Sequence, residues 1–255
     1  MKNLFLFATG ALLALSACTS SPRGPGPARG YDRLHQQIRE NPIGDPGKVA
    51  ATDIAFSRAA RDNGQWTAFA EYAAPGAVLH GAGGPIEAAP WLAAQQNPAE
   101  SVRWGPKTVW SSCDGHVAVS FGRFIEPSGM VGSYVTVWEW QKEGRYRWVY
   151  DMGAADNPQP APVPEVEENI DTIIVSGLAS IEGRIADCLR GGTPPALPAV
   201  LVPANSRHES KSSPDGTLRW RWEHSGDGTR RFVADWLRNG TWQEALEFTA
   251  PPQGG

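Results

Sequence analysis

Three ionisable residues stand where this chain could carry out acid–base chemistry: Asp53, His80 and Asp151. Asp53 shares a predicted helical face with Val49, so burial would raise the pKa of its carboxyl group and suit it to proton transfer. His80 lies between a short apolar segment and a glycine-rich loop, and imidazole titrates near neutral pH. Asp151 ends a predicted strand. We therefore take these three residues as candidate catalytic groups.

Each candidate also has a structural interpretation. Asp53 could accept hydrogen bonds from backbone or Trp N–H groups and only organise the fold, because structural networks also perturb carboxylates. Asp151 could be a turn or cap residue, and a lone histidine is usually a hydrogen-bonded or surface residue. Four further residues are candidates for the lining of a pocket, although aromatic residues at strand spacing more often form a core: Trp91, Arg123, Tyr134 and Trp138.

Several classes of site are not indicated by the sequence. There is no Cys/His spacing typical of zinc, no Gly-x-Ser-x-Gly motif and no calcium loop, and the loop at 81–84 lacks the lysine of a phosphate-binding loop. We therefore expect no metal and no cofactor. The formal net charge is −4 without a basic stripe, which argues against a nucleic-acid partner.

The N-terminus has the order of a secretory signal. Lys2 precedes an apolar segment, Leu4 to Leu15, that is shorter than the roughly 20 residues of a membrane-spanning helix. It ends in Leu-Ser-Ala-Cys at 15–18, which resembles the lipobox of bacterial lipoproteins. The resemblance implies a signal peptide at 1–17 and a lipid-modified Cys18 that anchors the chain in the membrane. The alternative is an ordinary signal peptide with a chance cysteine. Thr19, where retention in the inner membrane would need Asp, favours the outer membrane, facing the periplasm of the cell envelope.

Cys113 and Cys188 remain once Cys18 is lipidated. Export would place them in an oxidising compartment, where a disulfide can form and persist. The sequence leaves open whether they are bonded, because it does not show whether their Cβ atoms approach each other.

The chain divides by composition into a tether, two domains and a linker. We expect a flexible tether with a short helix over 18–47, a first domain over 48–155, a Pro-rich acidic linker over 156–168, and a β-rich domain over 169–250. The clearest helix begins at Asp45-Pro46, a cap followed by a favoured first residue, and ends before Gly64.

Shorter helices are predicted at about 67–73 and from Pro90, followed by strands at 117–124, 133–141 and 145–151. The three-residue loop at 142–144 places Glu139 opposite Arg147 and Trp138 opposite Trp148. This register puts five aromatic side chains on one face of the sheet: Trp138, Trp140, Tyr146, Trp148 and Tyr150. The opposite face receives Val135, Val137, Val149 and Asp151.

The second domain is predicted to contain strands at 218–224, 231–236 and 242–248. Asp-Gly pairs at 215–216 and 227–228 and the Asn-Gly pair at 239–240 indicate hairpin turns. Leu218, Trp220 and Trp222 alternate with charged residues, which predicts one apolar face and one charged face.

Three ordered segments, 53–86, 114–124 and 132–154, together resemble the nuclear transport factor 2-like superfamily. The resemblance covers residues 48–155 and is nearest to its branch of uncharacterised SnoaL-like and ketosteroid-isomerase-like domains. It implies an α+β fold: a cone-shaped, curved antiparallel sheet packed on N-terminal helices around a pocket. The tyrosine and acid of the isomerases have no match residue by residue, so that activity is not carried over. No family is recognised for 166–250.

Three hypotheses follow. The first is an envelope lipoprotein whose cone domain binds a small apolar or aromatic ligand, or an envelope protein, without catalysis. The second is an isomerase-like or dehydratase-like enzyme that uses Asp53, Asp151 or His80. The third is a structural scaffold of the envelope. A homodimer is compatible with each of them.

Overall fold

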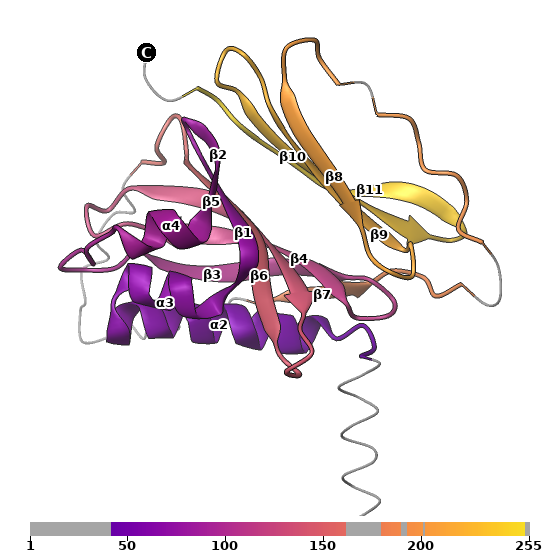
Figure 1. Ribbon diagram of the computed structural model, residues 1–255, viewed down its shortest axis with the longest axis horizontal. Coiled ribbons are helices and arrows are strands. Elements are labelled where there is room, and N and C mark those ends of the chain that lie inside the picture. The colour runs from indigo at the N-terminus through magenta and orange to yellow at the C-terminus, as the bar shows by residue number, and fades with distance from the viewer. Residues whose placement is uncertain (1–41, 162–179, 190–192, 201, 253–255) are drawn as a thin grey trace, which may run out of the picture. The chain divides into compact units, whose positions relative to one another are not determined.

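The computed structural model describes residues 42–161, 180–189, 193–200 and 202–252, all of which belong to one compact unit. The predicted signal peptide, Cys18 and the short helix of the tether lie outside the described residues. The fold is α+β, as predicted, with three helices, a curved seven-stranded sheet and a separate four-stranded sheet (Figure 1). No helix in the described ranges is long and apolar enough to cross a membrane.

The helices are α2 (Pro46–Asn63), α3 (Gln65–Tyr72) and α4 (Ala88–Ala93). The predicted start of α2 is confirmed, because the Asp45 side chain accepts a hydrogen bond from the backbone N–H of Lys48 at 3.0 Å. Gly64 ends the helix with a φ of 100°, a conformation that favours glycine. The buried face of α2 includes Asp53 and Phe56.

The seven-stranded sheet has the order β2-β1-β6-β5-β4-β3-β7. Its strands are β1 (Ala73–Gly81), β2 (Gly84–Glu87), β3 (Arg103–Ser111), β4 (Val117–Ile125), β5 (Val131–Trp140), β6 (Tyr146–Ala155) and β7 (Glu182–Ile185). The central strands β3 to β6 pair antiparallel. β4, β5 and β6 correspond to the three predicted strands, whereas a strand over 103–111 was not predicted. The pairs β1–β6 and β3–β7 are parallel, so the sheet is mixed rather than wholly antiparallel.

The predicted register of the β5–β6 hairpin is confirmed near its turn, where Trp138 pairs with Trp148 and Glu139 with Arg147. The next pair joins Val137 to Tyr150, so β6 contains one extra residue, Val149. Such a bulge moves every following side chain to the opposite face.

Two face assignments were therefore wrong. Tyr150 packs with Val137 in the core against the four-stranded sheet, whereas Trp138 and Trp148 pack with the helices. Asp151 consequently lines a pocket with residues of the helices and does not share the face of Val137.

The four-stranded sheet has the order β11-β10-β9-β8 and is wholly antiparallel. Its strands are β8 (Arg207–Ser212), β9 (Leu218–His224), β10 (Arg230–Arg238) and β11 (Thr241–Ala250). The last three confirm the predicted strands. The turn before β11 has positive φ at Asn239 (51°) and Gly240 (72°), as expected of an Asn-Gly hairpin. β8 was not predicted.

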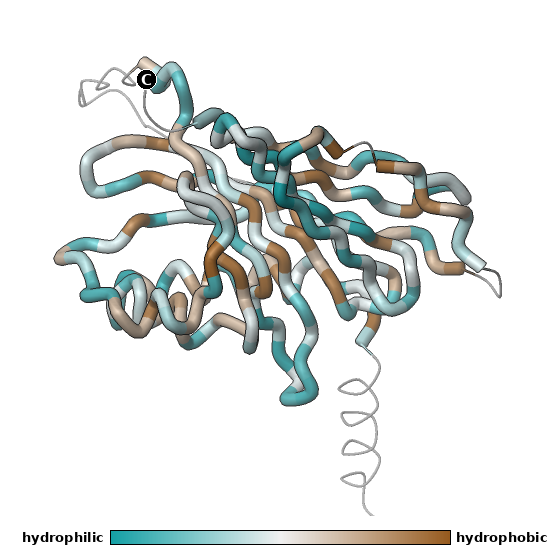
Figure 2. The backbone as a smooth tube through the Cα atoms, turned by 45° about the horizontal axis from the view of Figure 1, so that its top comes forward, coloured by the Kyte–Doolittle hydropathy of each residue, from teal (hydrophilic) through white to brown (hydrophobic). Residues whose placement is uncertain are grey.

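The two faces of the larger sheet support two different cores. Helices cover one face, around Phe56, Trp138 and Trp148. On the other face, Tyr150 packs with Trp220 and other residues of the four-stranded sheet. Figure 2 shows hydrophobic residues along the strands of both sheets. The central strands are thus buried on both sides.

The charged face of β9 is also largely buried, although alternation predicted only that it would be charged. Arg219 is 5% exposed and Glu223 is 4% exposed. Asp235 accepts hydrogen bonds from Arg219 Nη2 at 2.6 Å and from Arg221 Nη1 at 2.5 Å. These charges are tolerated because each faces an opposite charge.

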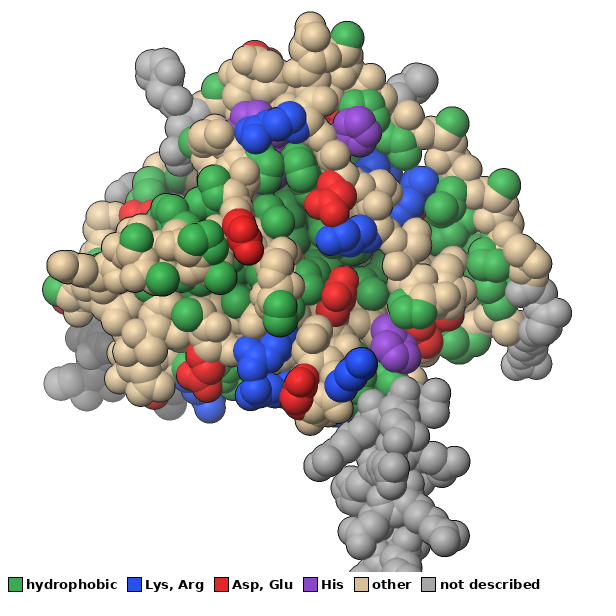
Figure 3. All heavy atoms as spheres, viewed as in Figure 1, with side chains coloured by type: hydrophobic (Ala, Val, Ile, Leu, Met, Phe, Trp, Pro, Cys, Tyr) green, Lys and Arg blue, Asp and Glu red, His purple; other side chains and the backbone are tan. Residues whose placement is uncertain are grey.

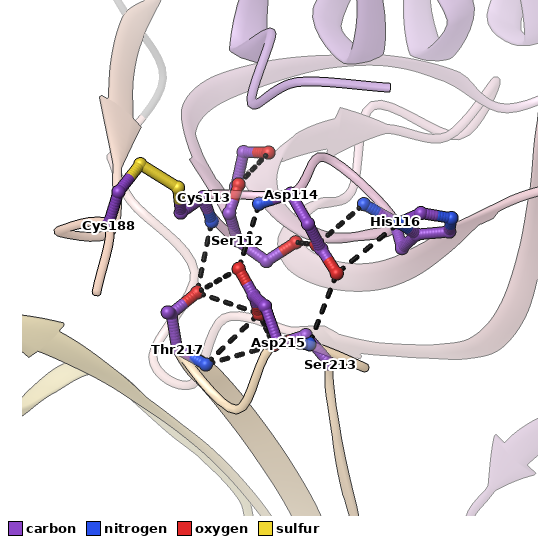
Figure 4. Close-up of a disulfide and its surroundings, with 9 residues drawn as sticks. Ser112, Cys113, Asp114, His116, Cys188, Ser213, Asp215 and Thr217 are labelled. Carbon is purple, nitrogen blue, oxygen red and sulfur yellow. Dashed lines mark hydrogen bonds and ion pairs between the residues drawn. A yellow bond between two sulfur atoms is a disulfide. The ribbon is translucent and has the colours of Figure 1, made fainter. Parts of the chain in front are cut away.

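Cys113 and Cys188 lie at disulfide-bonding distance, with their Cα atoms 5.1 Å apart (Figure 4). Beside them, the β3–β4 and β8–β9 turns bind each other reciprocally. The Asp114 N–H donates to Asp215 Oδ2 at 2.8 Å, and the Asp215 N–H donates to Asp114 Oδ2 at 3.2 Å.

The two turns can pair because they have nearly the same sequence and geometry. They read Ser-Ser-Cys-Asp-Gly at 111–115 and Ser-Ser-Pro-Asp-Gly at 212–216. In each, a serine hydroxyl donates to the aspartate Oδ1 at 2.6 Å, and the glycine has a φ near 70° (69° and 67°). Each turn therefore presents an aspartate oxygen and an N–H to the other.

We expect Asp215→Asn to lower the free energy of unfolding by about 1–3 kcal/mol, because both carboxylate oxygens accept N–H or O–H donors and the new amide would face one of them. Asp227→Asn is the matched control. Asp227 occupies a similar turn, but it is exposed, and among the described residues its carboxylate accepts hydrogen bonds only from within that turn, mainly from Thr229, so its replacement should change little. Urea unfolding measures both. Equal losses in the two variants would contradict the role of the paired turns.

Candidate functional site

A pocket of about 530 Å³ opens on the helix-facing side of the larger sheet. Its wall is formed by residues of all three helices, of the β1–β2 hairpin and of β3 to β6. Most of the lining is apolar, and its aromatic members are Phe56, Trp66, Phe69, Trp91, Trp104, Phe124 and Tyr134.

The aromatic residues contact one another edge to face, which fixes the wall and leaves the space open. The ring centroids of Phe56 and Phe69 are 4.8 Å apart, and those of Trp66 and Trp91 are 5.0 Å apart. Such pairs add stability beyond simple burial.

Asp53 lies behind this wall and is fully buried. Its carboxylate accepts hydrogen bonds from Trp104 Nε1 at 3.0 Å, Ser120 Oγ at 2.8 Å and Tyr134 OH at 2.9 Å. Burial raises the pKa of Asp53 to about 6, and the three hydrogen bonds oppose that shift.

Asp53 is not among the residues that line the pocket. Its hydrogen bonds join α2 to β3, β4 and β5, and Trp138 Nε1 extends the network by donating to Ser120 Oγ at 3.0 Å. This arrangement matches the structural interpretation of Asp53, since its oxygens already hold three donors.

Asp151, in contrast, lines the pocket. Its Oδ2 accepts a hydrogen bond from Thr136 Oγ1 at 2.6 Å, and among the described residues no donor reaches Oδ1. Burial raises the pKa of Asp151 to about 7, the Thr136 hydrogen bond lowers it, and the charge of Asp53 raises it. Asp151 is therefore a carboxyl group that changes charge near neutral pH at an apolar wall.

His80 contributes to the wall, but its ring nitrogens are engaged elsewhere. It is 2% exposed; its Nδ1 lies 2.6 Å from Tyr150 OH, and its Nε2 lies 3.1 Å from His224 Nδ1. Burial, followed by the charges of neighbouring basic groups, lowers the pKa of His80 to about 3. The imidazole is therefore neutral and is not free to transfer a proton in the pocket.

Of the four residues predicted to line a pocket, Trp91 and Tyr134 line this one, and Arg123 lines a separate, more open hollow beside it. Trp138 does not, because it is completely buried in the helix-side core. In that separate hollow, the guanidinium of Arg123 donates to Asp156 and to Ser133 Oγ. Arg123 is thus an ion-pair residue at the strand ends.

Sequence reasoning missed several residues of the wall. Trp66 lies in the first turn of α3 and Trp104 on β3, and only their residue type could have indicated them. Glu126 and Met130 lie around the β4–β5 turn, and no local pattern connected that turn with α3 and α4.

In the part of the chain that the structure describes, no group of three or more His, Cys, Asp or Glu side chains could hold a metal ion. No protein-family model matches the chain, and no curated protein matches it either.

We predict that Asp53→Leu lowers the free energy of unfolding by about 3–5 kcal/mol, because three buried donors would lose their acceptor. Asp53→Asn should cost clearly less. Its amide oxygen can accept from Trp104, and its NH₂ can donate to the hydroxyl groups of Ser120 and Tyr134. Chemical denaturation compares the two variants. Equal stabilities would show that the network does not support the fold.

Proposed function

We propose that this chain is a lipid-anchored protein of the bacterial cell envelope that binds a small, mostly apolar ligand in a cone-shaped domain. The observation that carries the proposal is the open pocket with Asp151 in its wall. A volume of about 530 Å³ suits a molecule of two to four rings, within the usual range of small-molecule sites.

The chemistry of the wall narrows the class of ligand. The aromatic side chains favour a flat apolar or aromatic body. Below pH 7, the protonated Asp151 can donate a hydrogen bond, so a carbonyl oxygen on the ligand would match it. We therefore favour an aromatic or alicyclic ketone or aldehyde.

The cone shape and membership of the nuclear transport factor 2-like superfamily are part of the same proposal. The support is the order of segments over 48–155, the α+β class, and a pocket on the helix-covered side of a curved sheet. Fold analogy alone is a weak warrant for function, so the pocket chemistry carries more weight.

Catalysis is the second candidate. The pKa of Asp151, near 7, favours it, because a general acid or base works best near the operating pH. Against it, the nitrogens of His80 and the oxygens of Asp53 are already hydrogen-bonded to protein groups. A single available group supports binding better than proton transfer. Because the pocket is open, ligand binding is also favoured over a purely structural scaffold.

2-Acetylnaphthalene, a neutral aromatic ketone, is the probe for this proposal. We expect it to quench the fluorescence of the Trp residues in the wall, and to bind about tenfold more weakly at pH 8 than at pH 6. Asp151 loses its proton as the pH rises through about 7. The carboxylate can then only accept hydrogen bonds, and so can the carbonyl oxygen of the ketone, so the hydrogen bond between them is lost.

Asp151→Asn keeps a donor at every pH and should therefore bind the probe with little pH dependence, even though Asp53 titrates in the same range. Trp91→Ala should weaken binding, whereas Trp242→Ala, in β11, should not. If the fluorescence quenching does not saturate with the concentration of 2-acetylnaphthalene at either pH, the proposal is wrong. Conversion of a ketone with an acidic α-proton, abolished by Asp151→Asn, would favour the enzymatic alternative.

The anchor has its own test. In a bacterial host, the full chain should fractionate with the membrane and carry diacylglycerol on Cys18, as shown by mass spectrometry. Cys18→Ser should move it to the soluble fraction, because the anchor depends on the acyl chains. The Cys113→Ser/Cys188→Ser double variant is the control that stays with the membrane. A wild-type chain without lipid would contradict this part of the proposal.

A further inference from the structure

Three basic side chains form one row across the four-stranded sheet. Arg207 of β8 and Arg230 of β10 are both directly opposite His224 of β9. Directly opposed residues in antiparallel strands point to the same face, so the two arginines flank one imidazole. Burial, followed by the charges of Arg207 and Arg230, lowers the pKa of His224, so both guanidinium groups act on the same point.

Four other basic residues of this sheet have acidic partners, whereas the exposed Arg238 stacks on the Trp236 ring instead. Arg219 and Arg221 bind Asp235, Arg231 binds Glu223 and Glu247, and Lys211 binds Glu209. Within the described residues, neither Arg207 nor Arg230 forms an ion pair. The acid that acts on His224 is Asp227, an exposed turn residue whose carboxylate accepts the Thr229 N–H.

Arg230 is the most constrained member of the row, being only 2% exposed. Its Nη1 donates to the carbonyl oxygens of His80 and Gly153, each at 3.0 Å, while its buried Nε has no hydrogen-bond partner. A buried guanidinium cannot escape its charge by losing a proton, and without an anion it carries a desolvation cost.

Arg207 approaches from the solvent side. Its guanidinium lies so close to Gly84 that a Cβ atom there would be 1.8 Å from Nη2, so glycine permits the contact. On the same face of the four-stranded sheet, His224 is hydrogen-bonded to His80. Figure 3 shows basic and histidine side chains gathered between the end of the β1–β2 hairpin and the four-stranded sheet.

We propose that the row Arg207, His224 and Arg230 binds an oxyanion, a phosphate or carboxylate group. Two arginines and an imidazole offer the donors that such a group accepts, and an anion here would offset the repulsion along the row. The site is distinct from the wall around Asp151. It borders the pocket, however, because His80, Gly84 and Gly153 belong to both surroundings.

The test is a calorimetric titration of the folded protein with inorganic phosphate at constant ionic strength. Arg207→Gln should bind phosphate about tenfold more weakly than the wild type, through the loss of one charged donor pair. Arg61→Gln, an equal change of charge on α2, should bind like the wild type and thereby excludes a general charge effect.

Arg207 is exposed and without a hydrogen bond among the described residues, so its replacement should leave the fold intact, which circular dichroism verifies. NMR titration of the His224 ring should show its pKa rising when phosphate binds, and not in Arg207→Gln. If the wild type binds no phosphate, or if Arg207→Gln binds it equally well, the proposal is overturned.

A second arm distinguishes the source of the anion. If 1-naphthyl phosphate binds at least tenfold more tightly than inorganic phosphate, and Trp91→Ala removes that advantage, the group belongs to the ligand of the pocket. Equal affinities would assign a free anion instead, and both results support the oxyanion site. Retained binding of 2-acetylnaphthalene by Arg207→Gln would show that the pocket stands independently of the row.

Discussion

The buried carboxylate of Asp53 is the interaction on which the helix-covered half of the structure depends. A carboxylate without solvent is tolerated only when its oxygens are satisfied, and Trp104, Ser120 and Tyr134 satisfy them from β3, β4 and β5. α2 is thereby fixed against three strands at one point. The same contacts orient the ring of Trp104 so that it forms part of the pocket wall. The arrangement that stabilises the fold therefore also shapes the space that a ligand would occupy.

The second determinant is a single extra residue in β6. The bulge at Val149 reverses the faces of the residues that follow, so Asp151 reaches the helix side and Tyr150 reaches the four-stranded sheet. Tyr150 OH then lies within hydrogen-bonding distance of His80 Nδ1, and His80 Nε2 is hydrogen-bonded to His224. One local irregularity thus supplies the titrating group of the pocket and a polar connection between the two sheets.

Local signals in the sequence were sufficient for much of the fold. The cap at Asp45, the glycine of the 142–144 loop and the Asn-Gly turn act over a few residues, and each predicted its element. Tertiary features were not predictable in this way. Val149 resembles any strand residue, β8 has a polar sequence without alternation, and the paired turns lie about a hundred residues apart. The ion pair of Arg123 was not predictable either, because its partner, Asp156, follows β6 and was assigned to the linker.

Asp53 and Arg230 show why buried charges of opposite sign have different consequences in this protein. Both lie almost without solvent, and neither forms an ion pair among the described residues. Asp53 can become neutral near pH 6, so protonation limits the free-energy cost of burying it. Burial lowers the pKa of Arg230, which also favours the neutral form, but a guanidinium stays charged across the whole physiological range. Two backbone carbonyls satisfy only part of its donors. A carboxylate whose oxygens accept three donors is compatible with a purely structural role, whereas a guanidinium with unsatisfied donors beside two more basic groups supports the proposed oxyanion site.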